Sequence, residues 1–85
     1  MLAVELAPVR VNAVSPGIIA TPWWDWMPAE ARQQAFDGFA KTAPVGRVGT
    51  AEDLAEAIGF LVSSTFTTGV VLPVDGGSRH NPASL

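Results

Sequence analysis

The chain has 85 residues, of which 48% are hydrophobic and 15% charged, and its net charge is −3 at pH 7. A chain of this length forms at most one small domain, and its few scattered basic residues disfavour nucleic acid as a partner. It has no cysteine and a single histidine, His80, so neither disulfides nor a metal site are expected to reinforce the core.

No stretch of the sequence has the apolar length that a bilayer requires. Residues 1–8 lack the basic flank and the apolar length of a signal peptide. We therefore expect a cytoplasmic protein with no membrane partner.

The chain opens with the expected end of a helix, followed by a strand. Residues 1–6 place apolar side chains at helical spacing, and Pro8 prevents the helix from continuing. No capping residue precedes this helix, so the chain reads as if it begins in mid-element. Segment 9–14 is rich in β-branched residues and ends at Ser15-Pro16-Gly17, which predicts a buried strand.

The middle of the chain is expected to hold a loop at 18–27 and a helix at 28–41. Pro28 suits the first position of that helix. Its apolar stripe consists of Ala31, Ala35, Phe36 and Phe39. A second loop covers residues 43–49.

The last predicted elements are a capped helix and a short strand. Thr50 is a favourable N-cap, and Glu52 and Asp53 place negative charge at the positive end of the helix, which runs to about Ser63. Segment 69–74 reads as a strand closed by a glycine turn at 75–77. Pro73 cannot donate to a ladder, so we expect an edge strand, followed by an irregular tail.

Two strands joined through helices favour a parallel pair with a crossover connection. A parallel sheet needs cover on both faces, and the first strand would present an unpaired apolar edge. The sequence therefore predicts part of a larger sheet, with the remaining strands elsewhere.

Four motifs in this order resemble the C-terminal third of a short-chain dehydrogenase/reductase. They are residues 2–8, the Val-Arg-Val-Asn-Ala-Val-Ser-Pro-Gly run at 9–17, Gly46-Arg47-Val48-Gly49 with Glu52-Asp53-Leu54-Ala55, and residues 68–77. The resemblance implies an α/β fold, namely the end of a doubly wound Rossmann sheet of parallel strands. Segment 9–14 would be its penultimate strand and 70–74 its edge strand, so residues 1–85 would form a single partial domain.

The resemblance also implies a cofactor site at the turn after the first strand. Pro16 and Gly17 would shape the wall beside a nicotinamide, the backbone of Ile19 would meet its carboxamide, and the Thr21 hydroxyl would reach the carboxamide or a phosphate. A carboxamide has both a donor and an acceptor, which a main-chain N–H and C=O can satisfy together. The alternative is a plain strand-terminating turn.

Residues 22–45 match the variable substrate lid of the family, and residues 78–85 form its tail. The lid begins with Trp23, Trp24, Trp26 and Met27, which could wall an apolar or aromatic substrate. Equally, these side chains could pack the lid helix or a subunit contact.

The resemblance places the family's catalytic tyrosine and lysine before Leu2, and this chain has no tyrosine. Lys41 falls in the lid, Ser15 does not match the catalytic serine, and no glycine-rich loop follows a first strand. We therefore expect the chain alone to be inactive and to bind no dinucleotide. A truncated reading frame with an originally internal Met1 would explain this.

The resemblance implies a parent oxidoreductase that uses NAD or NADP, transfers hydride to or from an alcohol or carbonyl substrate, and forms homo-oligomers. The alternative is a non-catalytic interaction or oligomerisation module that adds its strand edge to a related sheet. A third reading, membrane-surface association through the tryptophans, is disfavoured by the neighbouring Asp25 and Glu30.

Overall fold

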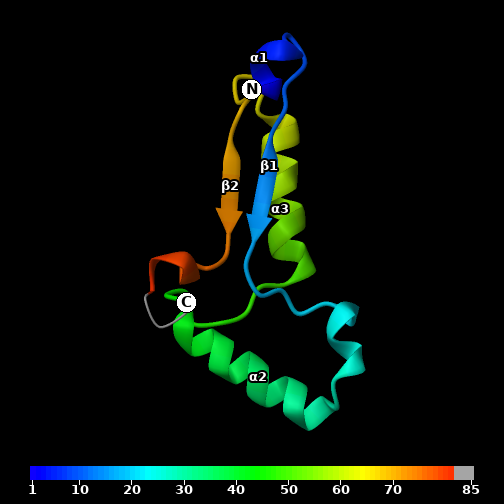
Figure 1. Cartoon of the computed structure of the whole chain (residues 1–85), viewed down its shortest axis with the longest axis vertical. Helices are drawn as coiled ribbons and strands as arrows, with labels where there is room; N and C mark the ends of the chain where they lie inside the picture. The colour runs from blue at the N-terminus through cyan, green and yellow to red at the C-terminus, as the bar shows by residue number, and fades with distance from the viewer. Residues whose placement is uncertain (82–85) are drawn as a thin grey trace.

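A computed structural model of the chain describes residues 1–81 (Figure 1). Its regular elements follow the expected order of helix end, strand, lid helix, helix and strand, which confirms a small α/β piece. In chain order they are α1 (Leu2–Glu5), β1 (Ala13–Pro16), the 3-10 helix η1 (Pro22–Trp26), α2 (Ala29–Thr42), α3 (Ala51–Ser63), β2 (Val71–Val74) and the 3-10 helix η2 (Ser78–His80).

The two strands of the described region pair in parallel, as the sequence predicts, with Ala13 opposite Val71 and Pro16 opposite Val74. The Val74 carbonyl accepts the Gly17 N–H at 3.1 Å. Because backbone groups alternate along a strand, Pro73 turns its nitrogen away from β1, toward the outer edge of the sheet. Its missing N–H therefore leaves the ladder between the two strands intact.

The expected bounds of the first strand are wrong, because β1 begins at Ala13 and not at Val9. The residues just before Ala13 are held by side-chain hydrogen bonds and not by a regular strand ladder. Asn12 accepts the Val70 N–H through Oδ1 at 3.1 Å and donates through Nδ2 to the Thr67 carbonyl at 3.0 Å. The strand also extends two residues beyond the predicted end, as far as Pro16.

Two segments expected to be irregular contain short helices. The loop predicted at 18–27 includes η1, which has Pro22 at its start, and the predicted tail includes η2. The glycine turn at 75–77 is confirmed, since Gly76 and Gly77 have φ of 62° and 85°. The remainder of the predicted tail, residues 82–85, lies outside the described residues.

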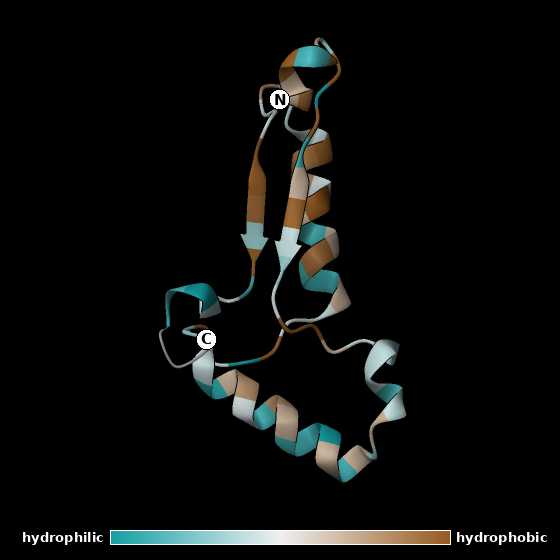
Figure 2. Cartoon of the chain, viewed as in Figure 1, coloured by the Kyte–Doolittle hydropathy of each residue, from teal (hydrophilic) through white to brown (hydrophobic). Residues whose placement is uncertain are grey.

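The fold leaves much apolar surface open. The accessible area is 6045 Å², against about 4,800 Å² for a compact protein of this mass. The radius of gyration is 15.5 Å, against about 12 Å for a compact domain of this length. Figure 2 shows apolar residues along β1, β2 and α3, whereas α2 runs apart from the sheet. Four apolar residues in the described region are buried: Ala3, Ile19, Ala43 and Leu61.

Candidate functional site

The turn after β1 depends on the close approach of Gly17 to the end of β2. A Cβ atom at Gly17 would lie 2.8 Å from the Cβ of Asp75 and 2.9 Å from its Cα. Real Cβ atoms do not approach that closely, so only glycine fits between the two strand ends. Pro16 is the exposed last residue of β1. The two residues thus bring the chain across the carboxyl end of the sheet.

Ile19 presents its backbone polar groups on one side of this turn. The Gly49 N–H donates to the Ile18 carbonyl and the Ala20 N–H donates to the Gly49 carbonyl, both at 2.9 Å. These two bonds form a parallel bridge between Ile19 and Gly49. In a parallel bridge of this kind, the N–H and C=O of the central residue, here Ile19, point away from the partner segment. One donor and one acceptor on the same side complement a primary amide. The chemistry of this residue therefore fits the carboxamide of a nicotinamide.

Thr21 stands at the start of η1 in an extended conformation, with φ −129° and ψ 168°. Its carbonyl accepts the Trp24 N–H at 3.1 Å. Its hydroxyl makes no capping hydrogen bond with the helix, so it is not used in the way that threonine hydroxyls commonly are at this position.

The three tryptophans, which the sequence gives no reason to separate, have different environments. The indole nitrogen of Trp24 donates to the Ile19 carbonyl at 2.8 Å. Its ring lies 5.7 Å from the Phe36 ring and 6.2 Å from the Phe39 ring, between centroids. Trp23 and Trp26 are 68% and 66% exposed. Trp24 therefore packs against α2, whereas the other two leave most of their surface accessible.

The segment expected to form the lid, residues 22–45, is joined to the rest of the chain near both ends. At the first end, the Trp24 indole donates to the Ile19 carbonyl, and an ion pair between Arg32 and Asp25 at 3.1 Å joins α2 to η1 within the segment. At the second, the Val45 N–H donates to the Gly76 carbonyl at 3.1 Å. Helix α2 between them has no buried residue. Met27 is the C-cap of η1 and is half-buried.

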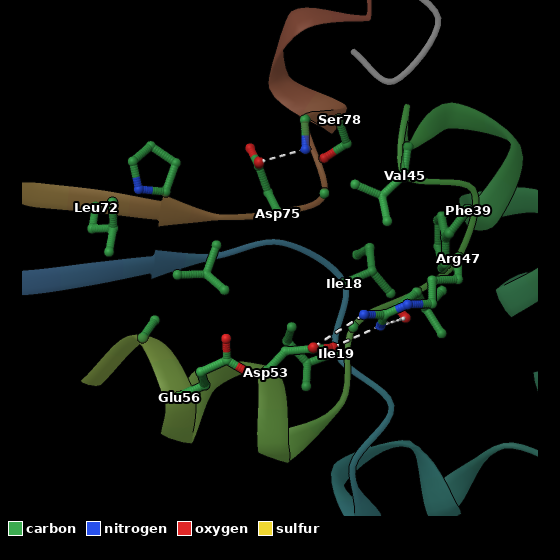
Figure 3. A pocket seen from close by; sticks show the side chains of 18 of the residues that line it. Ile18, Ile19, Phe39, Val45, Arg47, Asp53, Glu56, Leu72, Asp75 and Ser78 are labelled. Carbon is green, nitrogen blue, oxygen red and sulfur yellow. Dashed lines mark hydrogen bonds and ion pairs between the residues drawn. The ribbon is translucent and has the colours of Figure 1, made fainter. Parts of the chain in front are cut away.

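A cavity of about 590 Å³ lies at the carboxyl ends of the strands (Figure 3). This is the end at which open α/β sheets bind ligands. Its acidic residues are Asp53, Glu56 and Asp75, and its apolar wall includes Ile19 and Phe60. Only the rule about strand ends could have located it from the sequence, because its residues come from four separate segments.

Arg47 and Asp53 form an ion pair beside this cavity. The Arg47 guanidinium contacts the two carboxylate oxygens of Asp53 at 2.7 and 3.1 Å. Together with the Thr50 backbone N–H, it holds the pKa of Asp53 well below its ordinary value, and the pKa of Arg47 is raised in turn. Thr50 and Asp53 also complete a capping box at the start of α3. The expected helix-start role of Asp53 is thus confirmed.

Two kinds of feature are absent from the described residues, 1–81. No group of three histidine, cysteine or carboxylate side chains there is placed to hold a metal ion. No helix of this part has both the length and the apolar character needed to cross a membrane.

Comparisons with known proteins give a consistent result. A family model described as enoyl-(acyl carrier protein) reductase matches residues 1–79. The chain is 42% identical over 77 residues to the short-chain dehydrogenase/reductase ATR9 of Stachybotrys chlorohalonatus, covering 91% of this chain and 30% of that one. It is 44% identical over 71 residues to the 3-oxoacyl-[acyl-carrier-protein] reductase FabG of Thermotoga maritima, covering 81% and 27%.

Solved structures agree with the sequence relatives. A small-chain dehydrogenase in complex with NADPH superposes with a TM-score of 0.87 at 42% identity, covering 94% of this chain and 36% of that one. The chain therefore spans about a third or less of the length of the proteins it resembles.

Proposed function

The chain belongs to the short-chain dehydrogenase/reductase family, and from that premise we propose that it supplies one wall of a nicotinamide site and the substrate lid of an NAD(P)-dependent oxidoreductase. The complete enzyme would transfer hydride between the nicotinamide and an alcohol or carbonyl carbon. The dinucleotide supplies or accepts the hydride when it is bound. The residues of this chain bind and orient its amide end.

The backbone of Ile19 is the observation that carries this proposal. Its N–H and C=O point to the side opposite Gly49 and match the acceptor and donor of a carboxamide. Pro16 and Gly17 set the path of the turn, and the hydroxyl of Thr21 lies two residues further along the chain. A solved relative that holds NADPH supports the choice of ligand.

The lid completes the proposed site on the substrate side. Trp23 and Trp26 expose apolar rings at 68% and 66%, which suits contact with an apolar substrate once the rest of the domain is present. The sequence contains no tyrosine, so the proton donor expected of this family must come from elsewhere. The chain alone is therefore expected to catalyse no hydride transfer.

A fusion protein tests the proposal. The chain replaces the matching segment of the Thermotoga FabG reductase, and NADPH affinity is measured by the fluorescence of the bound nucleotide. Ile19→Pro removes the backbone N–H while leaving an extended conformation accessible. We expect it to weaken NADPH binding about tenfold, the value of one lost hydrogen bond. Ile19→Val, which keeps the N–H, is the matched control. Equal affinities of the two variants would contradict the proposed wall.

The large exposed surface favours a second candidate function, that of a module which binds a second copy of itself or a related β-sheet. The described chain exposes about 1,200 Å² more than a compact protein of its mass would, which is more than each partner buries in a standard interface. This candidate predicts concentration-dependent oligomers without dinucleotide affinity. Sedimentation of a single monomeric species at all concentrations would exclude self-association.

A further inference from the structure

We propose that Trp24 is a latch, which ties the lid to the carbonyl of Ile19 when no carboxamide is present and releases that oxygen when one arrives. This inference rests on the proposed function, because it takes the Ile19 carbonyl as the acceptor for the carboxamide. It makes Trp24 a positioning residue for the lid, distinct from the exposed tryptophans beside it.

The contact between Trp24 and Ile19 has the distance of a well-formed hydrogen bond. The indole Nε1 of Trp24 lies 2.8 Å from the Ile19 oxygen, at the short end of the range for N–H···O bonds. Ile19 as a whole residue is 9% exposed, and the backbone groups of buried residues are normally paired. The Trp24 indole provides this pairing from five positions further along the chain.

The same side chain is packed into the lid. The rings of Phe36 and Phe39 in α2 lie against the Trp24 ring, and the Trp23 ring meets it edge-on with the centroids 4.8 Å apart. Movement of the Trp24 indole away from Ile19 must therefore shift the aromatic contacts that hold η1 to α2. One hydrogen bond thus links the state of the turn to the position of the lid.

Two donors compete for the carbonyl oxygen of Ile19, and this competition would release the lid. The carboxamide N–H₂ that the proposed site receives is a donor, as is the indole N–H, and both are directed at the Ile19 carbonyl. Exchange of one donor for the other conserves the number of hydrogen bonds, so it requires little free energy. The lid is consequently free to reposition after the nicotinamide end has bound.

Hydrogen exchange of the indole N–H groups in the ¹⁵N-labelled chain tests the latch directly. The chain has three tryptophans, and single Trp→Phe variants assign their signals. We expect the Trp24 indole N–H to exchange about tenfold more slowly than those of Trp23 and Trp26, the protection given by one hydrogen bond. In the fusion protein, excess nicotinamide is then expected to abolish this protection. N,N-diethylnicotinamide, which has the same ring and carbonyl but no amide N–H, should leave it unchanged.

The outcomes separate the latch from the proposed function. Exchange at Trp24 as fast as at Trp23 would overturn the latch whatever the ligand does. In a second outcome, nicotinamide shifts the backbone signal of Ile19 but the Trp24 indole stays protected. That result would show that both donors share the carbonyl oxygen, and it would overturn the proposed release of Trp24. Nicotinamide that shifts no signal would count against the nicotinamide wall, and the protected indole would still support the tie between lid and turn.

A second measurement in the fusion protein does not depend on the stability of the isolated chain. If the latch competes with the nucleotide, Trp24→Phe should tighten NADPH binding about threefold or more, since the competing donor is gone and the ring remains. Phe66→Leu, at a fully exposed aromatic position outside the lid, is the control and should leave affinity unchanged. A purely structural role for Trp24 predicts weaker binding instead, and that result would overturn the proposal.

Discussion

The guanidinium of Arg10 donates to the carbonyl of Leu61 at 2.7 Å, across 51 positions of the sequence. It also reaches the Val62 carbonyl at 2.9 Å. These carbonyls belong to the last turn of α3, where they have no partner within the helix. Arg10 thus holds the C-terminal end of α3 against the segment that leads into β1.

Removal of this side chain should loosen the two segments together. We expect Arg10→Ala to lower the free energy of unfolding by about 2 kcal/mol, because hydrogen bonds from a charged donor are lost and the carbonyls are left without it. Arg10→Lys keeps the charge but not the planar guanidinium, so its free energy of unfolding should lie between those of the wild type and Arg10→Ala. Urea unfolding followed by circular dichroism measures both. Arg79→Ala, at an exposed position, is the control, and an equal loss there would contradict this role.

Glycine at position 17 is required by the close approach of Asp75. We expect Gly17→Ala to destabilise the chain by about 1–3 kcal/mol, because the new methyl group meets both backbone and side-chain atoms of Asp75. Gly38→Ala provides the matched control, since nothing lies within 4 Å of a Cβ there. Alanine in a helix should stabilise α2 by about 0.5–1 kcal/mol. Thermal unfolding measures both variants, and midpoints of Gly17→Ala and Gly38→Ala that shift in the same direction would contradict this explanation.

The capping box of α3 predicts a specific acid sensitivity. The pKa of Asp53 is lower in the folded chain than in the unfolded one, where it is about 3.9. The carboxylate therefore stabilises the fold above this pH, and its contribution is lost as the pH falls further. Asp53→Asn should be less stable than the wild type at pH 7 and should converge with it in acid. Helix content measured from pH 7 to pH 2 would reveal parallel curves if this explanation is wrong.

Thr50 contributes to the same box through its hydroxyl, which accepts the Asp53 N–H at 3.2 Å. We expect Thr50→Ala to cost about 1 kcal/mol of stability, and Thr50→Ser to cost much less, since serine retains the acceptor. Urea titration at neutral pH measures the difference. Equal losses for the two variants would mean that the methyl group, and not the hydroxyl, is what matters.

Local signals made α3 and the strand pairing predictable. Thr50 and Asp53 mark the start of α3 in the sequence itself, and the glycines at 76 and 77 mark the turn after β2. Pro73 stands where its missing N–H does not interrupt the pairing of β1 with β2. Each of these depends on residues close together in the chain, which is why the sequence alone was sufficient.

Contacts between distant segments were not predictable. The start of β1 shifts because Asn12 pairs with residues more than 50 positions away, and no local pattern reveals such a partner. The separate environments of Trp23, Trp24 and Trp26 depend on where the Ile19 carbonyl and the α2 phenylalanines come to lie. The roles assigned to Pro16, Gly17, Ile19 and Thr21 stay predictions until a nucleotide is bound.

Pro73 has one more consequence, which concerns how this chain can be built into anything larger. Its ring faces the outer side of β2 and offers no donor there, so a further strand could not add to that side with a continuous ladder. On the side of β1 remote from β2, Val14 keeps its donor, whereas Pro16, the last residue of the strand, has none. A neighbouring strand is therefore expected beside β1, paired along Val14 and released from the ladder at Pro16.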